Sequence, residues 1–464
     1  MGAYAKSSRP GRHAQLLLRD NARMRTAPLP RPGLTLVLDR RARSAVGWTW
    51  LGSRLLVAVA AIVVAPLYGR SVSERTFDVR ALTHPFGDGG LAGATSSALS
   101  SLAHWDAIHY LDVAVNGYGR AAPGDVRAAF YPLYPMLVHV AAGFSSSPGV
   151  VLVAAYLVSA ASFLGALWLL RELVGLELGS RPAMRTVLLL AVFPAAFYYS
   201  APYPESLFLL VSVGAVYAAR RGRWAWAGLL AAAASATRPQ GLLVAIPIAL
   251  MYLYGPRSDG VPSALAGHAK GLRERMRPRY PIRRSAAWIA LAPAGIVLFS
   301  LYLWAKVGDP LAWRAVESGA YRYALLNPVT GLWRAATAAV SGAGHLLSGT
   351  PTVIHHFPDP WLAEARVVAF VVLALGWVAA VGAFRRLPLP YGAYAAASLF
   401  VPLVLQVPEE PLRGLTRYVC VVFPLFMWLA IVCERPRVRM PVLAASIAGL
   451  VLLTAQFAAW RWVA

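Results

Sequence analysis

Charged residues are scarce in this 464-residue chain, and their scarcity bounds the class of protein. Only 14% of the residues are charged and 58% are hydrophobic, whereas a soluble protein averages about 25% charged residues. Several apolar runs reach the roughly 20 residues that a helix needs to cross a bilayer. The composition therefore excludes an ordinary soluble protein and predicts a polytopic helical membrane protein.

Cysteine and cofactor motifs are also scarce. Cys420 and Cys433 fall in one apolar segment, which predicts neither a disulfide framework nor a cysteine metal site. In the tract HHFPDP (355–360), His355 and His356 are adjacent and their side chains diverge, which favours an exposed loop over a metal site. The sequence has no Walker loop and no Rossmann glycine pattern. We therefore expect no metal and no cofactor.

The few charges are strongly unbalanced, with 44 Lys and Arg against 20 Asp and Glu and a net charge of +24. Cytoplasmic loops of membrane proteins carry such basic clusters between apolar spans, and anionic membrane lipids are their expected partners. No recognition module accompanies the charge, so nucleic acid is not an expected partner. The clusters are residues 1–45, Arg220–Arg223, Arg257–Arg284, Arg385–Arg386 and Arg435–Arg439.

The hydropathy pattern predicts an all-α polytopic membrane protein with about eleven transmembrane helices. A cytoplasmic N-terminus and alternation of sides place every basic cluster inside and the loops 69–147, 307–360 and 407–414 outside. The expected spans are roughly 46–68, 148–170, 186–202, 204–219, 224–237, 240–254, 286–306, 361–384, 389–406, 415–433 and 440–460.

The first outer loop is too long for a mere connector, and it gathers acids that lipid would not tolerate. Apolar residues recur every three or four positions over 102–115, which predicts an amphipathic helix at the membrane surface. Asp106, His109 and Tyr110 share one face of that helix, while Asp112 lies about 240° further round. The acids of the loop are Asp78, Asp88, Asp106, Asp112 and Asp125.

Four tracts resemble, in this order, the GPI mannosyltransferase 2 (PIG-V) family and its bacterial relatives, which belong to the GT-C class of membrane glycosyltransferases. They are HWDAIHYLDVAVNGYG (104–119), AFYPLYP (129–135), FPAAFYYSAPYPESLF (193–208) and ATRPQGLL (236–243), and a weaker TRYVCVVFPLF follows at 416–426. The prolines and aromatics of AFYPLYP predict a rigid re-entrant or interfacial turn. ATRPQG departs from the Arg-Ser-Asn-Gly form of the eukaryotic members, which leaves the acceptor open.

The resemblance implies a GT-C-like fold and an inverting glycosyltransferase, most simply a mannosyltransferase, that uses a polyprenyl-phosphate sugar donor. It also implies that Asp106 is the general base, because GT-C enzymes keep a catalytic carboxylate in the first outer loop. Partial burial is expected to raise the pKa of this carboxylate toward neutrality. The alternative is that Asp106 has no catalytic role and is a solvated loop acid, or an acid at a helix N-terminus that the helix dipole favours. The expected acceptor is an envelope glycolipid, a lipoglycan or a protein.

The remaining site candidates are expected to bind substrate. Arg238 suits a donor phosphate, with Glu205 as its partner or as a sugar ligand; alternatively, the two form an interfacial ion pair. Arg417 either reaches the phosphate or snorkels, and His109 either orients Asp106 or only packs. The substrate-binding set is Trp105, His109, Tyr110, Tyr131, Tyr134, Glu205, Arg238, Arg417 and Tyr418.

The predicted topology and the resemblance together divide the chain into four parts. We expect an integral, multi-pass plasma membrane protein whose active site lies on the extracytoplasmic face. The parts are a basic cytoplasmic tail (1–45), an N-terminal transmembrane module (46–254) with a catalytic outer loop (69–147), a basic cytoplasmic loop (255–285) and a C-terminal transmembrane module (286–464) with an outer loop (307–360).

A transporter or flippase of lipid-linked sugars is the alternative function. Transporters tend to place polar groups at the bilayer midplane, on broken helices in repeated halves. Here the acids gather in a long outer loop, and the sequence shows no internal repeat. Both features favour the enzyme.

Overall fold

The computed structural model describes residues 32–65, 87, 90–118, 125–259, 278–350, 352–354, 357–461 and 463, and for 32–43, 352–354 and 357–363 the backbone alone. The chain divides into two compact units, Met1–Ala45 and Val46–Ala464. The helices and strands of the second unit form the candidate site. Asp78, Asp88, His355 and His356 lie outside the described residues.

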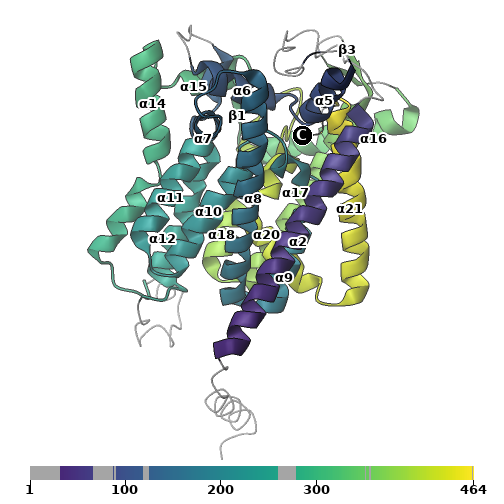
Figure 1. Ribbon diagram of the computed structural model, residues 1–464. Helices are drawn as coiled ribbons and strands as arrows, with labels where there is room; N and C mark the ends of the chain where they lie inside the picture. The colour runs from purple at the N-terminus through teal and green to yellow at the C-terminus, as the bar shows by residue number, and fades with distance from the viewer. Residues whose placement is uncertain are drawn as a thin grey trace, which may run out of the picture. The chain divides into compact units, whose positions relative to one another are not determined.

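The described residues are mainly helical, with short 3-10 helices (η) and two small two-stranded sheets (Figure 1). The elements are α2 (Pro32–Val64), α5 (Gly90–Ser100), α6 (Asp106–Asn116), η2 (Val126–Ala129), α7 (Leu133–Ala141), α8 (Pro148–Leu178), α9 (Ser180–Ala191), η3 (Ala196–Tyr199), α10 (Glu205–Arg220), α11 (Trp224–Thr237), η4 (Pro239–Val244), α12 (Ala245–Tyr254), η6 (Arg284–Leu291), α14 (Ala294–Val307), α15 (Ala312–Gly319), β1 (Ala324–Leu325), α16 (Pro328–Ser348), β2 (Thr352–Ile354), β3 (Phe357–Asp359), α17 (Pro360–Arg386), α18 (Leu389–Val404), β4 (Leu405–Gln406), α19 (Leu415–Cys420), α20 (Phe423–Val432) and α21 (Pro436–Ala458).

Four helices of the described residues are long and apolar enough to cross a membrane, which makes the chain an integral membrane protein. They are Ser44–Val64 of α2, all of α8 and α21, and Glu364–Arg386 of α17. A fifth span results if η6 and α14, which meet at 46°, count as one. The predicted number of about eleven spans is not confirmed, because several predicted spans are shorter apolar helices broken at prolines or glycines.

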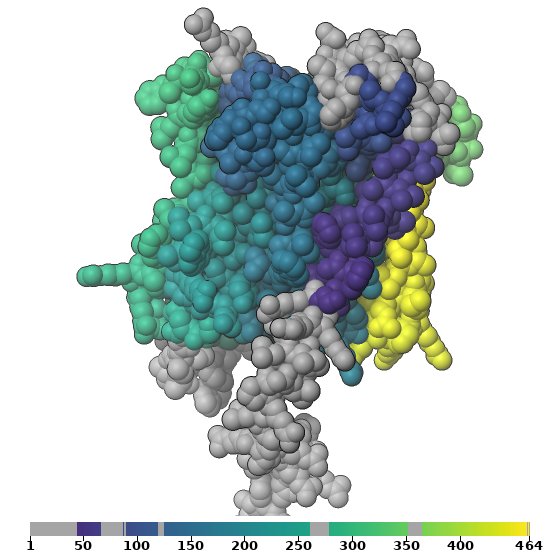
Figure 2. All heavy atoms as spheres, in the orientation of Figure 1, coloured from purple at the N-terminus to yellow at the C-terminus, as the bar shows by residue number. Residues whose placement is uncertain are grey.

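The long helices expose apolar side chains toward their surroundings and pack on one another through small residues. Figure 2 shows α8 in blue between the teal segments of α10–α12 and the purple part of α2. A Cβ at Gly165 of α8 would lie 3.1 Å from Leu210, and one at Gly214 of α10 would lie 3.2 Å from Leu230. Small residues at such points let helices approach closely in a membrane protein.

A buried arginine secures the backbone between α9 and α10. Arg54 of α2 donates hydrogen bonds to the carbonyl oxygens of Ala191 (3.1 Å) and Ala196 (2.7 Å) and to Ser200 Oγ (2.8 Å). The carbonyl of Ala191, the last residue of α9, has no partner within that helix. Arg54 therefore anchors the segment that leads directly into Glu205.

The helix predicted near residues 102–115 is present, but it is shorter and more buried than a surface helix. It begins at Asp106, and six of its eleven residues are buried, so protein rather than a membrane surface covers it. AFYPLYP (129–135) is a turn only over 130–132, because α7 already begins at Leu133. In Figure 1, α6, α7 and α15 lie together at one end of the long helices.

Candidate active site

Asp106 is the first residue of α6, where the helix dipole favours a negative charge. The preceding Trp105 has a positive φ of 57°, which turns the chain into the helix. His104 is held by the carbonyl oxygen of Phe457, 3.0 Å from its Nδ1, and it stacks on Trp460. These contacts tie the start of α6 to the end of α21.

Four side chains of alternating charge form a continuous chain at the site. Arg417 Nη1 lies 2.5 Å from Asp106 Oδ2, and Arg417 Nε lies 2.7 Å from Glu205 Oε1. Arg238 Nη1 donates to the same Glu205 oxygen at 2.7 Å. Arg417, from the weaker fifth tract, therefore joins Asp106 to Glu205, and Glu205 also binds Arg238, so residues from four of the five tracts meet here.

Glu205 is the most deeply buried member of this chain of charges, with no exposed surface. Its Oε2 atom has no hydrogen-bond partner among the described residues. Arg238 is also buried, and its guanidinium carbon lies 5.1 Å from the centre of the Tyr418 ring. Removing one partner of a buried ion pair typically lowers the stability of a protein by about 3–5 kcal/mol. The chain of charges therefore also stabilises the fold.

The local backbone explains how Arg238 reaches Glu205. Arg238 is extended (φ −158°, ψ 150°) and ends α11, and Pro239 then starts η4. Gly241 packs so tightly against α11 that a Cβ there would lie 2.1 Å from the carbonyl carbon of Ala234. Only glycine lets η4 fold back so closely onto α11. This turn points Arg238 away from α11 and toward α10.

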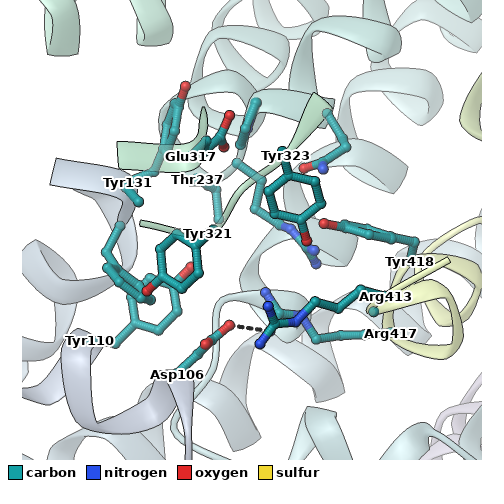
Figure 3. A pocket seen from close by; sticks show the side chains of 16 residues that line it. Asp106, Tyr110, Tyr131, Thr237, Glu317, Tyr321, Tyr323, Arg413, Arg417 and Tyr418 are labelled. Carbon is teal, nitrogen blue, oxygen red and sulfur yellow. Dashed lines mark hydrogen bonds and ion pairs between the residues drawn. The ribbon is translucent and has the colours of Figure 1, made fainter. Parts of the chain in front are cut away.

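Every member of this chain of charges except Glu205 lines one open pocket, seen in Figure 3. Asp106 keeps 25% of its side-chain surface exposed, so a substrate can reach it. In Figure 3, Arg417 extends toward Asp106 from one side, and Tyr321 and Tyr323 stand above the pair. The lining residues are Asp106, Tyr110, Ala129, Phe130, Tyr131, Thr237, Arg238, Pro239, Gln240, Glu317, Tyr321, Tyr323, Arg413, Gly414, Arg417 and Tyr418.

The expected rise in the pKa of Asp106 is wrong. Burial alone would raise its pKa, but the charge of Arg417 and the hydrogen bond from it outweigh that effect, and His109 and Arg413 act in the same direction. The pKa of Asp106 is therefore lowered below its ordinary value, and the carboxylate stays ionised at neutral pH. The expectation failed because Arg417 lies 311 residues away in the sequence.

Four of the predicted substrate-binding residues do not line the pocket, and of these only Glu205 belongs to the chain of charges. Trp105 packs on Trp460, and Tyr134 bonds to Ser159 Oγ at 2.9 Å behind the ring of Tyr110. His109 packs against Phe130, with ring centres 4.8 Å apart. Among the described residues, Asp106 is hydrogen-bonded to Arg417 and not to His109. Tyr110, Tyr131, Glu205, Arg238, Arg417 and Tyr418 all lie in the pocket or in the chain of charges.

Four lining residues with polar or charged side chains fall outside the tracts that carry the resemblance and were not predicted: Glu317, Tyr321, Tyr323 and Arg413. Glu317, Tyr321 and Tyr323 follow α14, in a segment where the sequence has neither a recognisable motif nor a clear hydropathy pattern. A two-residue ladder between β1 and β4, with Ala324 opposite Gln406, ties this segment to the end of α18. The only signal in the sequence is a lone acid followed by two tyrosines in a loop predicted to lie outside.

No group of three or more His, Cys, Asp or Glu side chains suited to a metal occurs within the described ranges. The expectation that the protein needs no metal stays a prediction, since His355 and His356 fall outside those ranges.

Solved structures with a similar arrangement are remote. An Archaeoglobus fulgidus oligosaccharyltransferase, crystallised with Zn and sulfate, aligns with a TM-score of 0.41 and 13% identity, over 87% of this chain and 53% of that chain. ArnT from Cupriavidus metallidurans, bound to undecaprenyl phosphate, aligns with a TM-score of 0.27 and 14% identity, over 75% of this chain and 72% of that chain. TM-scores below 0.5 are too low to assign a fold.

Sequence comparison is more informative. Residues 53–254 match the sequence model of the family described as Mannosyltransferase (PIG-V). The GPI alpha-1,6-mannosyltransferase 2 of Mus musculus is 31% identical over 176 residues, 36% of this chain and 34% of that protein. The protein of that name from Cricetulus griseus is 32% identical over 154 residues, 31% of this chain and 30% of its own length.

The similarity thus spans about a third of the length of these curated relatives. The matched region contains Asp106, Glu205 and Arg238 but not Arg417. Over residues 53–254 the chain is therefore similar to the PIG-V mannosyltransferase family, as its motifs predicted.

Proposed function

We propose that the protein is an inverting glycosyltransferase, most simply a mannosyltransferase, that takes its sugar from a polyprenyl-phosphate donor on the extracytoplasmic face of the membrane. The observation that carries the proposal is the open pocket in which Asp106 pairs with Arg417 beside Arg238. The family match over residues 53–254 supports the reaction class. The acceptor we propose is a hydroxyl of an envelope glycolipid, lipoglycan or protein.

Asp106 acts in this proposal as the general base. The acceptor oxygen forms a bond to the anomeric carbon of the sugar while the bond from that carbon to the phosphate oxygen breaks. The acceptor proton passes to Asp106, and polyprenyl phosphate leaves with the bonding electron pair. Positioned proton transfer of this kind contributes typically about 10²–10⁴-fold to a rate.

The arginines supply the electrostatic part of the reaction. Arg238 and Arg417 are fixed by Glu205, so their N–H groups are already oriented before a phosphate arrives. Preorganised donors of this kind stabilise charge that develops on a leaving group. Because Arg417 also holds Asp106, a phosphate that binds Arg417 competes with that carboxylate and raises the pKa of Asp106 when substrate is present.

A second, largely apolar cavity adjoins the pocket and suits the prenyl chain of the donor. It shares Arg238, Gln240, Tyr323, Arg413 and Tyr418 with the first pocket. Its other lining residues are mostly apolar and come from α10, η4, α18, β4 and the α19–α20 junction: Phe208, Leu243, Tyr394, Ser398, Val401, Pro402, Leu405, Val421 and Val422. A phosphate at Arg238, which lines both cavities, therefore leaves a lipid tail on the apolar side and a sugar on the Asp106 side.

Transfer of label from a lipid-linked donor tests the proposal. The purified full chain in lipid nanodiscs is incubated with polyprenyl-phosphate [³H]mannose and an envelope lipid extract, and in parallel with GDP-[³H]mannose. We expect a labelled product from the lipid donor alone. A transporter or flippase would instead move the intact donor between leaflets of a vesicle without consuming it, and that result would overturn the enzyme assignment.

A further inference from the structure

Glu317 is a second carboxylate in the pocket, and its position comes from α15. Trp313 and Glu317 are four residues apart on this helix, so they share one face. The Trp313 ring meets the Tyr131 ring edge-on, with centres 5.9 Å apart. Because α15 also packs against η2, the face that carries Glu317 is held against the segment that contains Tyr131.

Within the described residues, neither the Glu317 carboxylate nor the Tyr131 hydroxyl forms a hydrogen bond. The Tyr131 hydroxyl is buried and has no hydrogen-bond partner, although the rings of Phe299 and Trp313 fix its side chain. The Glu317 carboxylate forms no hydrogen bond or ion pair there, and Arg314 acts on it only through its charge. Buried hydroxyls are normally paired, so the unpaired Tyr131 hydroxyl indicates a missing ligand, and half-buried Glu317 offers an unpaired acceptor in the same pocket.

The two groups lie at the opposite end of the pocket from the phosphate-binding arginines. Figure 3 shows Tyr131 and Glu317 near each other, away from the pair of Asp106 and Arg417, with Tyr321 between the two ends. The charge of Glu317 also acts on the Tyr131 hydroxyl, which agrees with their closeness. A donor held at the arginines would therefore leave this end free for the second substrate.

We propose that Glu317 and Tyr131 form the subsite that binds hydroxyl groups of a sugar acceptor. The inference rests on the proposed glycosyl transfer for the role of the bound sugar, but not for the binding itself. A carboxylate accepts hydrogen bonds from sugar hydroxyls, and a phenol both donates and accepts, so the pair can hold two neighbouring hydroxyls. The aromatic faces of Tyr321 and Tyr110 offer apolar surface for the sugar ring. The acceptor is then a glycan rather than the serine or threonine of a protein.

Direct binding tests the subsite without turnover. Saturation-transfer NMR measures the affinity of methyl α-D-mannopyranoside for the full chain in nanodiscs. Glu317→Gln and Tyr131→Phe should each weaken binding about tenfold, in keeping with the loss of one good hydrogen bond. Glu434→Gln, the same change at an exposed residue after α20, should have no effect. Wild-type affinity in both pocket variants, or no binding to the wild type, would overturn the subsite.

Transfer kinetics then separate the subsite from the proposed function. With polyprenyl-phosphate mannose as donor and the mannoside as acceptor, Glu317→Gln should raise the acceptor KM and leave the donor KM unchanged. A raised donor KM with an unchanged acceptor KM would contradict the assignment. If the wild type binds the mannoside but never transfers mannose, the proposed function fails and the subsite stands. Glu317→Asp, which keeps the charge, should recover part of the lost affinity.

Discussion

Arg417 is the residue on which the charges of the site converge, because it contacts both Asp106 and Glu205. The arrangement makes each charge depend on its neighbours. Arg417 keeps Asp106 ionised, and two arginines hold Glu205 in place. The guanidinium of Arg238 packs over the ring of Tyr418. Substitutions that delete a charge here therefore change stability as well as activity, and conservative changes are the more informative ones.

Arg238→Lys is such a change. Lysine keeps a positive charge next to Glu205, so the protein should still fold, but a point charge loses the planar fork that suits a phosphate. We expect the donor KM to rise about tenfold, which corresponds to about 1.4 kcal/mol. Lys306→Arg, on α14 and outside the pocket, controls for exchange between the two residue types. Unchanged donor KM and turnover in Arg238→Lys would exclude a bidentate phosphate role.

Glu317 and Asp106, the two carboxylates of the pocket, should affect the pH dependence of kcat/KM differently. Burial raises the pKa of Glu317 to about 7, only partly offset by Arg314, while Arg417 holds the pKa of Asp106 below its ordinary value. Glu317 therefore loses its negative charge as the pH falls through 7, whereas Asp106 keeps its charge. We expect kcat/KM for the acceptor to fall below about pH 7 in the wild type. A Glu317→Gln variant that keeps the same acid limb would contradict this origin.

At the scale of the elements, the return of η4 onto α11 sets the position of Arg238. Gly241→Ala would place a Cβ 2.1 Å from the Ala234 carbonyl carbon, so the two segments must separate. Overpacking of this kind costs typically about 1–3 kcal/mol, and we expect a lower melting temperature together with a higher donor KM. Gly344→Ala on exposed α16 meets no atom within 4 Å and should be neutral or mildly stabilising. Equal melting temperatures for both variants would show that the close return is not required.

Much of the element pattern could be predicted from hydropathy. The predicted segment 224–237 coincides with α11, and α8 and α17 begin within one residue of their predicted starts, because apolar runs and flanking prolines mark these helices locally. The number of spans could not be predicted in the same way. A run such as 186–202 reads as one span, but the chain breaks after α9 and continues as η3.

The candidate site was predictable only in part, for a related reason. Asp106, Glu205 and Arg238 lie in contiguous motifs, and those motifs carry the family resemblance. The partners that set their chemistry come from far along the chain: Arg417 is 311 residues from Asp106. Glu317 joins the pocket through the packing of α15 on η2, a contact that no local pattern encodes.

At the scale of the whole molecule, the distribution of basic residues predicts which side of the membrane each loop faces. Ser145, between α7 and α8, should face outward, and Arg221, between α10 and α11, should face the cytoplasm. Both native cysteines are buried, so single cysteines at half-buried Ser145 and exposed Arg221 can be labelled with little background. An impermeant maleimide should label Ser145→Cys in intact cells, and Arg221→Cys only after permeabilisation. The opposite pattern would reverse the topology and place the pocket inside.

Turnover of Asp106→Asn against Asp112→Asn tests the central claim most directly. Each variant removes one negative charge from the same helix, but Asp112 pairs with Arg127 and Asn116 and does not line the pocket. With polyprenyl-phosphate mannose as donor, Asp106→Asn should lose about 10²–10⁴-fold in kcat, roughly 3–5 kcal/mol of barrier, while donor binding is kept. Asp112→Asn should stay within a few-fold of the wild type. A kcat for Asp106→Asn as high as that of Asp112→Asn would contradict the assignment of Asp106 as the base.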